Sequence, residues 1–270
     1  MTSSGNVASM RDGTKIAYTL HGDGRAPVRI ALVHSLAMDR HFWDPVVKAL
    51  TDKASVLTYD CRGHGESDKP AGPYRIEQFA DDLSDLMDHV GWTSAVVAGA
   101  SMGGCVTLAF AAGHPQRAPA LGLIDTTAWY GADAPKQWAE RGEKGRSEGL
   151  ASLVGFQTTR WFSDAFRQQQ PEVVKACVDV FVRNDPEAYV ATCHMLGAAD
   201  IRLALPHITV PVAILVGEED YATPVAMAEA MHKAMPQSTL TVLEKGRHLT
   251  PLEQPERIAA ALSKLAAQVK

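Results

Sequence analysis

The sequence predicts an α/β fold with a mostly parallel sheet flanked by helices, interrupted by an all-helical insertion. Three observations lead to this prediction. Short apolar runs alternate with helical patterns through the first half of the chain. Strand-like runs then stop after Asp125 and do not return before about residue 200. The alternation resumes from there, and repeated strand–helix units are typical of a parallel sheet covered by helices on both faces.

The elements of the first half follow from local patterns. Asp12-Gly13 is a hairpin signal between two short strands, at 7–10 and 15–20. A helix is expected at Ile76–Val90, where apolar residues recur at helical spacing and Gly91 ends the pattern. A second helix is expected at Cys105–Ala112. Buried strands are predicted at the short apolar runs Val28–Val33, Val56–Tyr59, Ala95–Val97 and Leu121–Ile124.

The second half begins with helices alone and returns to the alternation. The insertion contains four helical stretches: Lys136–Lys144, Gly149–Arg160, Glu172–Arg183 and Pro186–Met195. The later part alternates in the order strand, helix, strand, helix: Val212–Val216, Val225–Met235, Thr239–Leu243 and Glu253–Val269. We therefore expect a core of residues 1–125 and 200–270, with residues 126–199 forming a helical cap over one edge of the sheet.

Composition limits the classes of partner. The 270 residues are 46% hydrophobic and 21% charged, with a net charge of −5 and no basic block, which disfavours nucleic acid. Met1–Lys15 lacks the apolar segment of a signal peptide, and no apolar run approaches the roughly 20 residues of a membrane span. The four cysteines form no CxxC pair, which predicts reduced, buried thiols in a cytoplasmic protein, with no metal site. The sequence does not indicate the oligomeric state.

A nucleophile is predicted at Ser101. Gly99-Ala100-Ser101-Met102-Gly103 is a G-x-S-x-G motif that follows a buried strand and opens a helix. This strand–turn–helix setting exposes the serine hydroxyl on a sharp turn, where a side chain at either glycine would meet the neighbouring backbone. The start of the helix adds free N–H groups that favour developing negative charge.

A serine hydroxyl needs a base, and His248 is the best candidate among ten histidines. It follows the last predicted strand, and folds with this turn place their members in the order serine, acid, histidine. His114 and His207 lie beside prolines in connecting loops, and His232 lies on a helix that looks solvated. We therefore assign His248 as the general base.

The acid is expected after the strand that lies between the serine and the histidine. The segment Gly217–Pro224 follows that strand and contains Asp220, with Glu218 and Glu219 as rival carboxylates. We prefer Asp220 for its place in the loop. The oxyanion needs two N–H donors, which we assign to the backbone of Met102 and of Leu36.

With these residues in place, the chain resembles the α/β-hydrolase superfamily, and within it the 3-oxoadipate enol-lactonase group. The resemblance covers nearly the whole chain. Its core segments are His34-Ser35-Leu36, Phe42-Trp43-Asp44, 59–68, 99–104, Gly217–Pro224 and His248–Glu256. Its cap segments are Trp138 with Arg141, Arg160-Trp161-Phe162, Asp185–Tyr189 and 199–202.

Three positions depart from that group. His34 stands where asparagine is usual, Ala100 replaces a larger residue beside the nucleophile, and Arg247 stands where a small residue is common. None of these departures touches Ser101, His248 or Asp220, but each bears on the substrate.

The resemblance implies hydrolysis of a small-molecule ester or lactone through an acyl-enzyme, without a metal or organic cofactor. Because an enol-lactone of this group carries a carboxylate, its pocket is expected to supply a cation. Arg141, Arg146 and Arg160 are the candidates, with Trp138 and Trp161 as apolar walls. By contrast, we interpret Asp60, Arg62 and His64 as structural residues that satisfy loop backbone groups.

Two kinds of alternative stay open. Carbon–carbon bond hydrolysis and perhydrolysis both use a serine–histidine–aspartate set. Dehalogenase and epoxide hydrolase chemistry are disfavoured, because they need a carboxylate where Ser101 stands. A ligand receptor that keeps the pocket and signals by moving its cap is the alternative outside enzymes.

Overall fold

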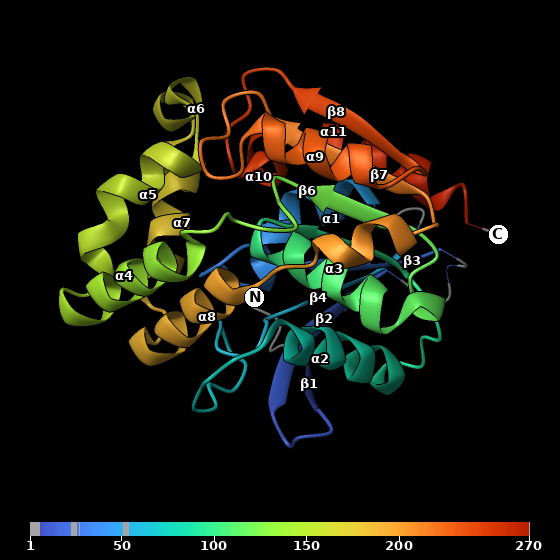
Figure 1. Cartoon of the computed structure of the whole chain (residues 1–270), viewed down its shortest axis with the longest axis horizontal. Helices are drawn as coiled ribbons and strands as arrows, with labels where there is room; N and C mark the ends of the chain where they lie inside the picture. Colours follow the sequence, from blue (N-terminus) through green and yellow to red (C-terminus); the bar gives the residue numbers. More distant parts are fainter. Residues whose placement is uncertain (1–5, 23–25, 27, 51–53, 270) are drawn as a thin grey trace.

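The computed structural model describes residues 6–22, 26, 28–50 and 54–269, and Met1–Gly5 of the predicted polar start lie outside them. One eight-stranded sheet runs through the molecule in the order β1-β2-β4-β3-β5-β6-β7-β8 (Figure 1). The β1–β2 and β2–β4 pairs are antiparallel, and all other pairs are parallel, which confirms the predicted mostly parallel sheet. The strands are β1 (Asn6–Ser9), β2 (Lys15–His21), β3 (Arg29–Val33), β4 (Ser55–Tyr59), β5 (Val96–Ala100), β6 (Leu121–Ile124), β7 (Val212–Gly217) and β8 (Ser238–Leu243).

Helices cover both faces of this sheet. On one face α1 packs against α11, and on the other α2 packs against α3; α9 contacts β7 and β8. β4, β5 and β6 are buried along their whole length, as expected for central strands covered on both sides. These helices are α1 (Asp44–Leu50), α2 (Ile76–His89), α3 (Met102–Gly113), α9 (Val225–Ala234), α10 (Thr250–Glu253) and α11 (Pro255–Ala266).

Between β6 and β7 the chain forms five α-helices, which lie together at one side of the sheet in Figure 1. α4 packs along α8, and short 3-10 turns connect or follow the helices. This arrangement supports the proposed division into a core and a cap of residues 126–199. The five helices are α4 (Ala134–Ser147), α5 (Val154–Trp161), α6 (Asp164–Gln169), α7 (Pro171–Val182) and α8 (Pro186–Ala198).

Three sequence predictions of secondary structure were incomplete. α1 and α6 were not predicted; they are seven and six residues long, too short to show a helical period clearly. The predicted helix over Glu253–Val269 corresponds to α11, which begins only at Pro255; Glu253 instead ends α10, and the non-helical backbone of Gln254, with φ −139° and ψ 53°, separates the two helices. No helix within the described residues is long and apolar enough to cross a membrane.

Candidate active site

Ser101 lies on the turn between β5 and α3. Its backbone has φ 53° and ψ −116°, a region that residues with a side chain rarely adopt. The turn is tight enough that a Cβ at Gly99 would overlap the carbonyl of Gly103. The tight turn therefore holds the serine in a strained conformation at the carboxyl end of β5, directly before the first turn of α3.

Two hydrogen bonds join Ser101 to His248 and His248 to Asp220. The Ser101 Oγ hydroxyl donates to His248 Nε2 over 2.9 Å, and His248 Nδ1–H donates to Asp220 Oδ2 over 2.8 Å. All three side chains are buried. Asp220 also accepts from the Ala222 and Thr223 amides and from the Thr223 hydroxyl. These bonds orient the carboxylate, which in turn selects the histidine tautomer whose Nε2 accepts from serine.

The rival side chains lie elsewhere. Glu218 accepts from the Lys245 amide over 3.0 Å, and Glu219 pairs with Arg247 over 2.8 Å. His114 pairs with Asp81 at the end of α3, and His232 contacts Ser238 on the exposed side of α9. The preference for Asp220 and His248 thus agrees with the geometry.

Leu36 and Met102 present backbone N–H groups that no acceptor among the described residues takes. Met102 is the first residue of α3, where the helix itself supplies no acceptor. Near Leu36, His34 Nδ1–H and the Met38 amide both donate to the Ser35 carbonyl, over 2.8 and 3.1 Å. Because the peptide that joins Ser35 to Leu36 is planar and trans, the Leu36 N–H points away from the Ser35 carbonyl. Both donors therefore remain free to bind an oxyanion.

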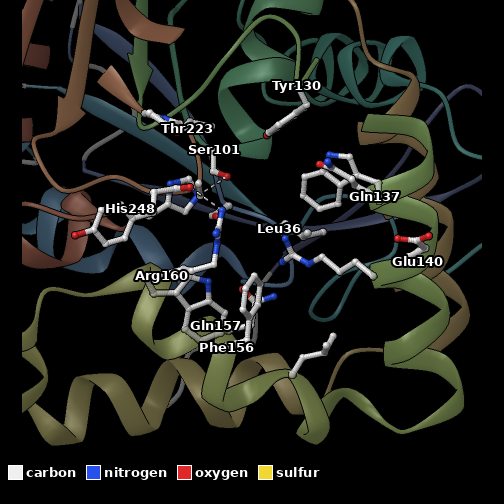
Figure 2. Close-up of a pocket in the computed structure, with 18 of the residues that line it drawn as sticks. Leu36, Ser101, Tyr130, Gln137, Glu140, Phe156, Gln157, Arg160, Thr223 and His248 are labelled. Carbon is white, nitrogen blue, oxygen red and sulfur yellow. Dashed lines mark hydrogen bonds between the residues drawn. The ribbon is translucent and has the colours of Figure 1, made fainter. Parts of the chain in front are cut away.

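A cavity of about 690 Å³ lies over Ser101 and His248 (Figure 2). Trp138, Trp161, Arg141 and Arg160 all line it, as expected from the sequence. Arg146 does not; it lies on the exposed side of α4 and pairs with Glu143 over 2.8 Å. The lining also includes side chains that the sequence analysis did not single out: Tyr130, Gln137, Phe156, Gln157 and Tyr221.

The cavity contains two guanidinium groups without an ion-pair partner among the described residues, those of Arg141 and Arg160. Arg141 donates to the Tyr189 hydroxyl and lies 4.7 Å from the Trp138 ring centroid. Arg160 donates to the Tyr221 carbonyl and reaches toward His248 in Figure 2. Burial and the nearby charge of Arg141 lower the pKa of Arg160. The cavity that Ser101 and His248 line thus also holds positive charge.

The loop that carries His248 is tied to α5 and to the segment after it. The His248 and Leu249 amides both donate to the Trp161 carbonyl, over 3.1 and 3.0 Å. Arg247 donates to the carbonyls of Thr159 and Phe162. These contacts explain the departure at Arg247, because its long side chain joins the histidine loop to the cap helices.

Asp125 is a buried carboxylate that the sequence analysis did not assign. It follows β6 and accepts from the Gly217 amide over 3.0 Å, and from the Thr250 amide and hydroxyl over 3.0 and 2.6 Å. Gly217 begins the Asp220 loop, and Thr250 lies two residues after His248. One carboxylate thus bonds to both loops. An acidic residue directly after a buried strand is the signal that could have identified it.

Asp60, Arg62 and His64 make structural contacts. Asp60 accepts from the Arg40 and Glu66 amides, Arg62 pairs with Asp82, and His64 donates to the Arg62 carbonyl. His64 also packs edge-on against His34, with 5.1 Å between ring centroids. Across the part of the chain that the structure describes, no group of three or more His, Cys, Asp or Glu is placed to hold a metal ion.

Acid is expected to destabilise the fold through the His34–His64 pair. Burial, followed by the charge of His34, lowers the pKa of His64 to about 3, and burial lowers the pKa of His34. An unfolded histidine has a pKa of about 6.5, so the unfolded state takes up protons first as the pH falls. The contribution of His64 to stability is therefore lost between about pH 6.5 and 3, by up to about 1.4 kcal/mol per pH unit, and the lowered pKa of His34 adds a loss in the same direction.

Urea unfolding at about pH 7 and about pH 5 measures this loss. His64→Gln keeps a donor for the Arg62 carbonyl but removes one titrating group, so it should have a shallower pH dependence than wild type. An identical slope in both proteins would contradict the assignment.

Comparison with known proteins agrees with this geometry. Residues 28–255 match the family described as the alpha/beta hydrolase fold. The 3-oxoadipate enol-lactonase 2 of Acinetobacter baylyi is 33% identical over 239 residues, 88% of each chain. The crystal structure of the enol-lactonase from Burkholderia xenovorans LB400 has a TM-score of 0.92 and 34% identity, covering 97% of this chain and 100% of that one. A thermophilic esterase from Thermogutta terrifontis has a TM-score of 0.91 and 29% identity, covering 98% and 99% of the two chains. The chain belongs to the α/β-hydrolase fold family, as its resemblance had predicted.

Proposed function

We propose that this protein hydrolyses a carboxylic ester or lactone through an acyl-enzyme on Ser101, as a 3-oxoadipate enol-lactonase-like enzyme acting on a small molecule. The observation that carries the proposal is the pair of hydrogen bonds that joins Asp220, His248 and Ser101 beneath a cavity. The similarity to enol-lactonases and esterases supports the same reaction class.

The proposed mechanism uses each group once in each half of the reaction. Ser101 Oγ attacks the carbonyl carbon while His248 Nε2 takes its proton, and Asp220 stabilises the imidazolium. The free N–H groups of Leu36 and Met102 bind the oxyanion. The carbon–oxygen bond then breaks, and the imidazolium protonates the leaving oxygen. Water activated by His248 releases the acyl group; an enol product tautomerises to the ketone.

A substrate with a carboxylate fits the cavity best. The guanidinium groups of Arg141 and Arg160 have no carboxylate partner among the described residues. Two other arginines of the inserted helices do have one: Arg146 pairs with Glu143, and Arg167 pairs with Asp164. Leaving two partly buried cations unpaired costs free energy, which an anionic ligand offsets. Glu140 and Lys144 also line the cavity, but both are exposed, and Glu140 lies far from Ser101 in Figure 2.

Removing both cations is expected to abolish the preference for charged esters. Arg141→Gln with Arg160→Gln should lower the ratio of kcat/KM for mono-p-nitrophenyl glutarate over p-nitrophenyl acetate by about 100-fold or more, since each of the two charge-assisted hydrogen bonds contributes about 1.5–3 kcal/mol. Arg146→Gln is the matched control, because it removes the same charge from the outer side of α4. An unchanged ratio in the double variant would rule out these arginines as the carboxylate site.

Wild-type enzyme assayed on three substrates tests the function. Turnover of p-nitrophenyl acetate and of a muconolactone-derived enol-lactone is the expected result. Cleavage of a dienone ring-fission product alone would instead favour carbon–carbon bond hydrolysis. Saturable binding with a thermal shift, but without turnover of any of the three, would favour a receptor. A cytoplasmic location remains a prediction, supported by four buried cysteines without disulfide partners.

A further inference from the structure

Tyr130 places a phenol at the reacting end of the cavity. The residue lies on the loop after β6 and lines the same cavity as Ser101 and His248. In Figure 2 its side chain comes from the side opposite Arg160, and its hydroxyl end points toward Ser101.

The phenol is held from two sides. The Tyr130 ring packs edge-on against Trp138, with 5.2 Å between centroids. Its oxygen lies 3.8 Å from the Sγ of Cys105, which sits one turn along α3 from Ser101. The Cys105 thiol donates to the Thr127 carbonyl over 3.2 Å and, more weakly, to the phenol. The phenol oxygen is thus positioned, while its own proton has no carbonyl or carboxylate acceptor among the described residues.

The proposed reaction has one oxygen for which the groups already assigned supply a single donor. The oxyanion has two N–H donors, from Leu36 and Met102. The leaving oxygen receives a proton from His248 only, and it carries developing negative charge as the bond breaks. The Tyr130 phenol, whose proton is unused and which lines the same cavity as Ser101, can donate a second hydrogen bond to this leaving oxygen.

We propose that Tyr130 is a further catalytic residue, whose phenol donates a hydrogen bond to the leaving oxygen of the ester or lactone. As the carbon–oxygen bond breaks, its electron pair moves to the leaving oxygen. The imidazolium of His248 transfers its proton to that oxygen, and Tyr130 keeps its own proton throughout. Burial raises the pKa of Tyr130 well above its ordinary value, so the phenol stays protonated. The inference rests on the proposed hydrolase function.

The test compares wild type with Tyr130→Phe on acetate esters of increasingly poor leaving groups: p-nitrophenyl, unsubstituted phenyl and ethyl acetate. The value of kcat/KM reports acylation, in which the leaving group departs. Tyr130→Phe is expected to lose about 10-fold in kcat/KM on ethyl acetate but less than about twofold on p-nitrophenyl acetate, because a good leaving group needs little help. The dependence of log kcat/KM on leaving-group pKa should therefore become steeper.

The slope distinguishes this role from a structural one. Partial unfolding lowers every rate on the same sample equally and leaves the slope unchanged. Tyr74→Phe, which removes a phenol outside this cavity, is the control and should keep the wild-type slope. An equal loss on all three esters, or no loss, would overturn the role of Tyr130 while leaving the hydrolase function intact. If wild type turned over neither the three acetate esters nor the enol-lactone, the proposed function itself would fail, and the role of Tyr130 would fail with it.

Discussion

Replacement of Ser101 by alanine is expected to lower kcat on p-nitrophenyl acetate by about 10⁴- to 10⁶-fold. In the proposed mechanism the hydroxyl forms the acyl-enzyme, and the residual rate would come from the oxyanion donors and the cavity alone. His248→Ala should cost nearly as much. The double variant should be little worse than either single one, because the two side chains act as a unit through their 2.9 Å hydrogen bond.

Ser152→Ala provides the matched control for the nucleophile. Ser152 lines the same cavity, is exposed and donates to the Gly149 carbonyl. Its loss should change kcat by less than about twofold, as is usual for a surface substitution. Burst kinetics with p-nitrophenyl acetate would measure acyl-enzyme formation directly. A burst that persists in Ser101→Ala would exclude this serine as the nucleophile.

Replacement of Gly103 by alanine is expected to prevent stable folding or to lower the free energy of unfolding by more than about 4 kcal/mol. A Cβ at this position would overlap the Val33 carbonyl oxygen and lie 2.8 Å from the His34 carbonyl oxygen. Both are backbone atoms, one at the end of β3 and one in the loop that contains Leu36, so neither can rotate away as a flexible side chain would. Any accommodation must separate α3 from β3, which also displaces Met102 and Leu36.

Gly113→Ala, at the other end of the same helix, is the control. A Cβ there meets no atom within 4 Å, and its backbone lies outside the left-handed region. The free energy of unfolding should therefore change by less than about 1 kcal/mol, since alanine is at least as good a helix former as glycine. Urea unfolding of both variants measures the difference. Equal stabilities would contradict the close approach of α3 to β3.

The sheet and the Ser101–His248–Asp220 contacts could be predicted because their signals are local or ordered along the chain. The G-x-S-x-G turn lies between a buried strand and a helix, and the acid and histidine follow later strands at the same edge of the sheet. Parallel strands bring these carboxyl ends together whatever the connecting loops contain.

The cavity walls were less predictable, because they depend on which face of each helix packs inward. Arg141 and Arg146 are five residues apart on α4, so about 140° of rotation separates their side chains. Only one can face the cavity. Helical geometry makes them alternatives, but α4 is too polar for its sequence to show which side is buried. Tyr130 lies on a loop, where no period applies, and only tertiary packing brings its phenol to Ser101.

The link between Trp161 and the histidine loop has a consequence for engineering. Trp161 lies in the helical insertion between β6 and β7, and its carbonyl accepts hydrogen bonds from two amides of the loop after β8. The insertion is therefore not an exchangeable module, although the sequence order makes it look like one. A chimaera that imports cap helices from a relative would need matching residues at 245–253, or the His248 loop would lose the two amide hydrogen bonds that anchor it to Trp161. Libraries that recombine the two segments as one block should yield active enzymes more often than libraries that split them.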